Sequence, residues 1–233
     1  MFVQVASHRR SGTHMLIDQL RANFSVLGTF RHLEEVAPAD CQASGLVLIK
    51  THEPSPGHKQ RRYQKTQHPN IDLINRVSRT AKHLYIFRDP YDTLESLYYF
   101  DLAGIEPLYN IDRNTSFMDF LLQRGTQDAA PGENRIQHWF GHVTAWIDHP
   151  AVLPIRYETF KTDPERKLLS ISAHLGVGRL PKSSKTPPTE VGAGTTRLLK
   201  QAELWGPDEL AAFDRFADRE LLRQLGYPPR AAR

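Results

Sequence analysis

Four short apolar runs, separated by patterns typical of helices, constrain the fold of this chain more than any other feature of its sequence. The runs are rich in β-branched and aromatic residues, as buried strands are: MFVQVA (1–6), GLVLIK (45–50), KHLYIF (82–87) and AVLPIRY (151–157). The helical patterns cover 13–24, 89–100, 134–147 and 163–176. This alternation predicts an α/β fold, a three-layer sandwich in which helices flank a central parallel sheet, as in P-loop NTPases.

The size and composition of the chain predict one globular domain over residues 1–233. Hydrophobic residues make up 39% and charged residues 24%, and the formal net charge of +4 is a mild excess that suits an anionic ligand. The single cysteine, Cys41, excludes an internal disulfide or a cysteine metal cluster and predicts a cytoplasmic protein. No apolar run approaches the ~20 residues of a membrane span, and a first strand at Phe2 leaves no room for a signal peptide.

The stretch SHRRSGTHM (7–15) joins the first strand to the first helix and has the composition of an anion site. Free backbone N–H groups of a first helical turn converge on one point, where the helix dipole adds positive charge. Gly12 would let the backbone approach the anion, Ser11 and Thr13 would add hydroxyl donors, and Arg9 and Arg10 would add charge. The alternative is a plain strand–turn–helix connection with solvated arginines.

The same turn departs from the usual ATP-binding pattern, G-x-x-x-x-G-K-[ST]. Ser7 stands where the first glycine belongs, Thr13 where the lysine belongs, and His14 where the magnesium-binding hydroxyl belongs. A magnesium-dependent, kinase-like phosphoryl transferase on the same fold is therefore the second hypothesis, not the first.

Two further strand ends carry chemistry. VLIKTHEP places Lys50 and His52 two residues apart, on one face of an extended chain. There His52 could act as a base that removes a proton, and Lys50 as a cation that stabilises a charged leaving oxygen. In YIFRDPYDTLES, Arg88 precedes Ser96 by eight residues, and the two could hold a second phosphate. Alternatively, Arg88 could pair with Asp89 or Asp92 as a structural cap.

In this order, these segments resemble the sulfotransferases that use 3′-phosphoadenosine 5′-phosphosulfate (PAPS). RRSGTHM is similar to their 5′-phosphosulfate loop (P-K-S-G-T-T-W), IKTHEP to their K-T-H-x-P segment, and FRDPYDTLES to their 3′-phosphate segment, with the arginine-to-serine spacing preserved. IRYETFKTDP resembles their Y-E-D-x-x-x-D-P segment. The resemblance implies sulfuryl transfer from PAPS to a hydroxyl, or an amine, of a small-molecule or glycan acceptor, with adenosine 3′,5′-bisphosphate (PAP) as product and without a metal.

The resemblance also implies the roles of single residues. His52 would be the catalytic base, and Lys50 and Arg10 would stabilise the leaving group. The residues expected to bind the donor are Arg9, Arg10, Ser11, Gly12, Thr13, His14, Met15, Arg88, Ser96, Tyr157 and Arg197. Among them, Arg10 replaces a lysine, Met15 replaces the tryptophan that stacks on adenine, and Arg197 in GAGTTR substitutes for a late R-K-G-x-x-G segment that the chain lacks.

The other segments are less specific. Residues 53–70 and 181–197 are expected to be long loops, either functional lids or plain surface. His138 and His142, four residues apart on a helix, could ligate a metal but have no evident third ligand. HKQRRYQK (58–65) is the sole hint of nucleic-acid binding, without a recognition motif beside it. The acceptor and the oligomeric state are not predictable from the sequence.

Overall fold

The computed structural model of the chain describes residues 1–42, 44–58, 69–105, 111–125, 132–181 and 204–230. Within these residues, no helix is long and apolar enough to cross a membrane. The chain forms two compact units that are interleaved in sequence. The first comprises Met1–Arg88 and Val143–Thr189, and the second comprises Asp89–His142 and Glu190–Arg233.

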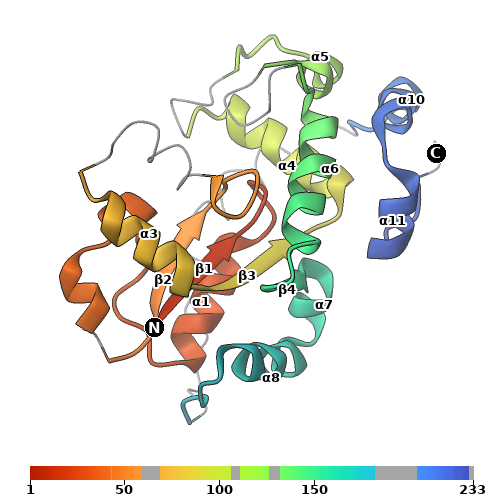
Figure 1. Cartoon of the computed structure of the whole chain (residues 1–233). Coiled ribbons are helices and arrows are strands. Elements are labelled where there is room, and N and C mark those ends of the chain that lie inside the picture. Colours follow the sequence, from red (N-terminus) through yellow and green to blue (C-terminus); the bar gives the residue numbers. More distant parts are fainter. Residues whose placement is uncertain (43, 59–68, 106–110, 126–131, 182–203, 231–233) are drawn as a thin grey trace. The chain divides into compact units, whose positions relative to one another are not determined.

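The first unit contains a four-stranded parallel sheet (Figure 1). Its strands are β1 (Phe2–Ala6), β2 (Val47–Thr51), β3 (Lys82–Phe87) and β4 (Val152–Arg156), in the order β2-β1-β3-β4. In the two central strands, every residue except Gln4 and Lys82 is buried, as is typical of parallel strands. Since all strands run in one direction, their carboxyl ends meet at one edge, where α/β proteins bind ligands.

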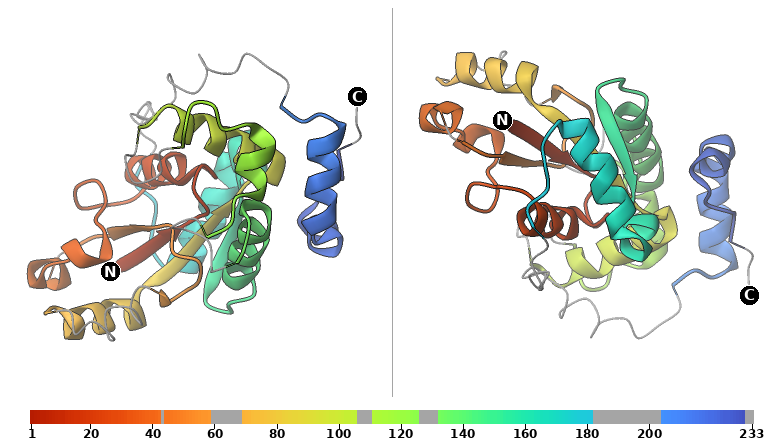
Figure 2. Two further views of the ribbon diagram at one scale, coloured as in Figure 1. Left: turned by 90° about the horizontal axis from the view of Figure 1, so that it is seen from above. Right: turned by 90° about the horizontal axis from the view of Figure 1, so that it is seen from below.

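Two separate cores cover the faces of this sheet. On one face, Val3, Val5, Leu84 and Ile86 pack with apolar side chains of the helices α1 (Thr13–Asn23), α7 (Tyr157–Thr162) and α8 (Pro164–Leu175). On the other face, Phe2, Val47 and Ile49 pack with α3 (Ile71–Thr80) and with the 3₁₀ turn η1 (Leu33–Glu35), which precedes a second turn, η2 (Pro38–Gln42). Figure 2 shows α1 and α3 on opposite sides of the strands. The first unit is therefore a three-layer α/β structure, as predicted.

The second unit is helical and is built around aromatic side chains. It contains α4 (Pro90–Leu102), α5 (Phe117–Leu122), α10 (Pro207–Phe216) and α11 (Arg219–Leu225), while α6 (Arg135–Ile147) begins in this unit and ends in the first. Ring contacts at centroid distances of 4.3–6.1 Å join its aromatic residues: Tyr91, Tyr98, Phe117, Phe120, Trp205 and Phe213.

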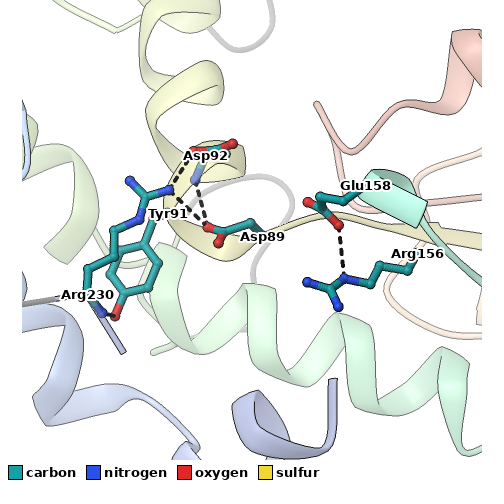
Figure 3. Close-up of polar contacts among 6 residues, drawn as sticks. All are labelled: Asp89, Tyr91, Asp92, Arg156, Glu158 and Arg230. Carbon is teal, nitrogen blue, oxygen red and sulfur yellow. Dashed lines mark hydrogen bonds and ion pairs between the residues drawn. The ribbon is translucent and has the colours of Figure 1, made fainter. Parts of the chain in front are cut away.

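The N-terminus of α4 is held by charged groups (Figure 3). The Asp89 carboxylate caps the helix by accepting the Asp92 N–H at 3.2 Å. The Arg230 guanidinium lies 2.6 Å from Asp92 and 3.5 Å from Asp89, and 4.8 Å from the centre of the Tyr91 ring. Arg230, far away in sequence, thus holds both carboxylates that had been considered as partners of Arg88.

The four strands and the four helices expected from the sequence are confirmed, within one or two residues at their ends. In the described part of the 53–70 segment, His58 is helical and no residue is in a strand, but α3, which begins at Ile71, was not predicted. The helices α5, α7, α10 and α11 were not predicted either. Of the 181–197 segment only Pro181 is described, and HKQRRYQK lies outside the described residues except for His58. The single domain over 1–233 stays a prediction.

Candidate functional site

The connection from β1 to α1 forms a tight turn at the carboxyl edge of the sheet. Arg10 and Gly12 both have left-handed backbones, with φ of 66° and 101°. Between them, the Ser11 N–H donates to the His8 carbonyl at 3.2 Å. Gly12 is the N-cap of α1 and carries no side chain that could occupy the end of the helix. This backbone makes a concave turn over the first N–H groups of α1.

Among the described residues, none compensates the N-terminus of α1. It has no side-chain cap and no acidic residue in its first turn. Every other helix in the described residues has an acidic residue in the first turn or a side-chain cap, such as Asn134 Oδ1, which accepts the Gln137 N–H at the start of α6. The positive end of the α1 dipole is therefore available to an anion.

The hydroxyl groups of the turn differ in their bonding. Ser7 Oγ and Thr13 Oγ1 form a short hydrogen bond, which ties the end of β1 to the start of α1. Ser11 is fully buried, and its Oγ has no hydrogen-bond partner within the described residues. A buried hydroxyl without a partner is costly. The combination of an orphaned hydroxyl and a glycine cradle fits an oxyanion such as the 5′-phosphosulfate of PAPS.

His52 lies beside this turn because β1 and β2 pair in register. Ala6 lies opposite Thr51, so the next residues, Ser7 and His52, meet beyond the strand ends. His52 Nδ1 is 2.9 Å from the Ser7 carbonyl oxygen. Because a carbonyl only accepts hydrogen bonds, Nδ1 carries the proton and donates it, which leaves the lone pair on Nε2.

The surroundings of His52 keep its ring neutral. Burial, and next the charge of Lys50, lower the pKa of His52 to about 3, while the hydrogen bond to Ser7 acts in the opposite direction. A neutral imidazole is the protonation state that a general base requires.

Lys50, in β2, is held by two aromatic side chains. Its Nζ lies 3.1 Å from His14 Nε2 and 5.1 Å from the centre of the Phe30 ring. The His14 ring meets the edge of Phe30 at 5.7 Å. Burial and then the charges of Lys50 and Arg10 lower the pKa of His14 to about 4. His14 is therefore neutral at neutral pH and accepts a hydrogen bond from the Lys50 ammonium.

Arg88 and Tyr157 lie next to the Gly12 turn. The Arg88 guanidinium is 5.0 Å from the centre of the Tyr157 ring. The same ring packs against Gly12 so closely that a Cβ built there would lie 2.8 Å from Tyr157 Cε2. The glycine thus permits the contact between the turn and the tyrosine.

The structure brings most of the predicted site residues of the first unit together: Arg10, Ser11, Gly12, Thr13, His14, Lys50, His52, Arg88 and Tyr157. Arg9 is buried, and Met15 packs against the core beneath α1. Ser96 belongs to α4 of the second unit, and Arg197 lies outside the described residues. In the described part of the chain, no group of three His, Cys, Asp or Glu side chains could hold a metal, and this includes the surroundings of His138 and His142.

Sequence reasoning missed three residues that support the site. Ser7 binds His52, Phe30 supports Lys50, and Trp146 Nε1 donates to the Glu53 carbonyl at 2.8 Å, next to His52. Trp146 is itself stacked on Tyr85, with ring centres 5.5 Å apart. The register of β1 against β2 was the signal that could have identified Ser7.

Comparison with known proteins gives the class of protein. Residues 3–186 match the sulfotransferase domain family, so the chain belongs to the sulfotransferases and is a transferase enzyme of that family. No curated protein of matching sequence was found.

The first of two similar solved structures supports the fold. Mouse sulfotransferase SULT7A1, complexed with PAP, is 17% identical, with 96% of this chain and 87% of that one covered, at a TM-score of 0.60. A sulfotransferase from Alicyclobacillus acidocaldarius is 17% identical, with 97% and 96% covered, at a TM-score of 0.49.

Proposed function

We propose that this sulfotransferase takes its sulfuryl group from PAPS and transfers it to a hydroxyl, or less favourably an amine, of an organic acceptor, with His52 as the general base. The observation that carries the proposal is the hydrogen bond from His52 Nδ1 to the Ser7 carbonyl. It puts the proton on Nδ1 and the lone pair on Nε2, near the N-terminus of α1 and the Lys50 ammonium.

The chemistry needs few protein groups. His52 Nε2 takes the proton of the acceptor hydroxyl as its oxygen bonds to sulfur, and the bond from sulfur to the bridging oxygen of the 5′-phosphate breaks. The product nucleotide, PAP, leaves with the negative charge, which Lys50, Arg10 and the first N–H groups of α1 stabilise. Arginine at position 10 keeps the charge of the family lysine but does not donate a proton to the leaving oxygen.

Donor recognition is proposed from the sequence resemblance. Arg88 and Ser96, at the family spacing, would bind the 3′-phosphate, and Arg9 and Arg197 would add charge. Tyr157 and Met15 would contact the adenine, with Met15 covering the ring less rigidly than a tryptophan. For Arg88 and Tyr157, the geometry in the first unit supports the proposal, since the two side chains are in contact beside Gly12.

Calorimetric titration tests the donor assignment. The chain should bind adenosine 3′,5′-bisphosphate much more tightly than 5′-AMP, and Arg88→Ala should remove most of this preference, because a hydrogen bond to a charged group contributes roughly 1.5–3 kcal/mol. Arg156→Ala is the matched control, because Arg156 also ends a strand of the sheet but pairs with Glu158 at 3.2 Å (Figure 3). Equal affinities for the two nucleotides would rule out the 3′-phosphate site.

Chelation separates this proposal from the second hypothesis, magnesium-dependent phosphoryl transfer. The proposed mechanism draws its positive charge from Lys50, Arg10 and the end of α1, so sulfuryl transfer to a verified acceptor should survive EDTA. Loss of turnover in EDTA, with rescue by magnesium, would favour the phosphoryl transferase.

A further inference from the structure

The first unit contains a polar cavity of about 280 Å³ away from the Gly12 turn. Its floor includes Gln4 and His83, which are paired in register on the two central strands of the sheet. Their neighbours Val3, Val5 and Leu84 face the core under α1, so Gln4 and His83 lie on the opposite face, which α3 partly covers. Two polar side chains at the centre of a parallel sheet are unusual, because such strands are normally apolar on both faces.

The walls and roof of the cavity also contribute polar groups, beside apolar residues such as Leu33, Ala81 and Ala151. The last turn of α3 contributes Ser78 and Arg79, and the segment before β4 contributes His149. The roof is the segment after β2, where Glu53, Ser55 and His58 line the cavity. The turn in the roof is closed by the His58 N–H, which donates to the Ser55 carbonyl at 3.2 Å.

His83 is the residue that points to a ligand. Its side chain is only 8% exposed, and its Nδ1 has no hydrogen-bond partner within the described residues. The ring of His149 meets it edge-on at 6.0 Å and leaves this nitrogen unsatisfied. A buried ring nitrogen of this kind is costly unless another group completes its bonding.

Apart from Glu53, each polar side chain that lines the cavity can donate a hydrogen bond. They include a guanidinium (Arg79), three imidazoles, two hydroxyls and the amide of Gln4. The one carboxylate, Glu53, already lies 3.7 Å from His58 Nε2. We propose that this cavity is a second binding site, which takes an oxyanion (a sulfate, phosphate or carboxylate group) between Arg79 and His83.

Binding at this site should be coupled to protonation. Burial, followed by the charges of His149 and His174, lowers the pKa of His83 to about 4, so its ring is neutral when the cavity lacks an anion. The other charged groups that line the cavity are Arg79 and the Glu53–His58 pair. An anion next to His83 favours the charged ring and raises its pKa. Affinity should therefore increase as the pH falls from 7 towards 5.

Sulfate, phosphate and acetate are the probes, titrated separately at constant ionic strength because salt screens such contacts. The protein is first saturated with adenosine 3′,5′-bisphosphate, so that the α1 site is filled. Calorimetry gives the affinity, and the imidazole NMR signal that is missing from His83→Phe locates the anion. We expect binding that His83→Phe and Arg79→Gln each weaken by roughly tenfold or more.

Arg76→Gln is the matched control, because Arg76 is an exposed arginine of α3 that does not line the cavity. It should leave the binding intact. Three results would overturn the proposal: no binding of any probe in the millimolar range, binding that His83→Phe and Arg79→Gln leave unchanged, or binding that the bisphosphate abolishes. If the chain fails to bind the bisphosphate, the donor assignment fails, yet the anion titrations of the His83, Arg79 and Arg76 variants still decide this proposal.

Discussion

At the scale of single residues, His52 is oriented by a hydrogen bond to a backbone carbonyl, whereas many catalytic histidines are oriented by a carboxylate. The Ser7 carbonyl fixes the tautomer without adding a negative charge, so it raises the pKa of His52 less than a carboxylate would. Nearby Lys50 acts in the opposite direction. The base is thereby kept neutral over the whole physiological pH range, at the expense of basicity.

The His52→Ala variant should fold, bind adenosine 3′,5′-bisphosphate and lose turnover by roughly 10²–10⁴-fold, the usual contribution of a positioned base. Steady-state kinetics with a verified acceptor, together with calorimetry and thermal unfolding, measure the three properties. Normal turnover of the variant would show that His52 is not the base. A parallel loss of nucleotide affinity and melting temperature would show a structural role instead.

The low pKa of His52 has a consequence for the pH–rate profile. A general base works in its neutral form, above its pKa, and the pKa of His52 is about 3. The acid limb of kcat/KM in the free enzyme should therefore not have its midpoint near ~6.5, the ordinary value for histidine. Rates measured from about pH 5 to 8 check this, and a midpoint between 6 and 7 that His52→Ala removes would contradict it.

His14 stands where the sulfotransferase pattern has a threonine, and the structure gives it a function of its own as the acceptor for Lys50. His14→Thr should slow turnover by roughly tenfold, because a hydrogen bond to a charged group is lost. His14→Gln, which keeps a neutral acceptor, should recover most of the rate. Full activity of the threonine variant would mean that the contact does not position Lys50.

Residues of the candidate site could be predicted where their role follows from a local sequence pattern, but not where it depends on contacts between segments that are distant in sequence. The Gly12 turn, Lys50, His52 and Arg88 belong to local strand-end patterns and were identified from the sequence. Ser7 and Phe30 act through pairing of distant segments, since Arg31 N–H donates to the Leu48 carbonyl beside β2. Registers of this kind are set by the packing of the whole sheet, which local patterns do not encode.

At the scale of elements, the start of α1 depends on Gly12. Gly12→Ala forces a side chain into the left-handed region and into the Tyr157 ring. It should cost at least about 1–2 kcal/mol of stability and weaken nucleotide binding, as measured by denaturant unfolding and calorimetry.

Gly176→Ala is the control for this prediction. Gly176 ends α8 with φ of 69°, and a Cβ there would meet nothing within 4 Å. The Gly176→Ala variant should lose only the stability that a side chain costs in the left-handed backbone region, and its nucleotide binding should stay intact. Equal binding by both variants would mean that the close contact between Gly12 and Tyr157 does not matter for the site.

In the second unit, Arg230 is expected to stabilise the start of α4. Arg230→Ala removes two ion pairs and a cation–π contact, all partly exposed, and should lower the unfolding free energy by about 1 kcal/mol. Arg223→Ala, which removes an exposed pair with Glu220 within one helix, should change the unfolding free energy much less. Equal effects in denaturant titrations would contradict the role of Arg230.

The elements that the sequence did not predict have physical reasons in common. The α3 segment, IDLINRVSRT, has apolar residues at positions 71, 74 and 77, a helical spacing, but it follows a Pro- and Gly-rich stretch that obscured its start. Tyr157 continues the apolar pattern of β4, yet the ladder with β3 ends at Arg156 and the chain turns into α7. The strands were easier to predict because their burial makes each one a continuous apolar run.

At the scale of the whole molecule, buried neutral histidines make stability depend on pH. The pKa values of His14, His52, His83 and His138 are lowered to about 4, 3, 4 and 4, mainly by burial. In the unfolded chain they titrate near ~6.5, so between these values the unfolded state binds more protons. Their stabilisation is complete above about pH 6.5 and is lost as the pH falls, by at most about 1.4 kcal/mol per pH unit for each histidine.

The melting temperature should therefore fall steadily as the pH is lowered from about 7 to about 4.5. Burial raises the pKa of Asp89, and this contribution has the opposite sign. His83→Phe should flatten the dependence, because it removes one of the titrating groups. A melting temperature that is constant over the range would contradict the neutral state of these rings.

The position of Trp146 makes its fluorescence useful for following the enzyme during turnover. Its indole N–H is bonded to the backbone one residue after His52, and its ring lies parallel to Tyr85. Since indole emission responds to both kinds of contact, this tryptophan is a natural optical probe of the segment that carries the proposed base. Subtracting the fluorescence spectrum of Trp146→Phe from that of the unmodified protein separates the emission of Trp146 from that of Trp139 and Trp205. Stopped-flow mixing could then time the motion of His52 during turnover without any attached dye.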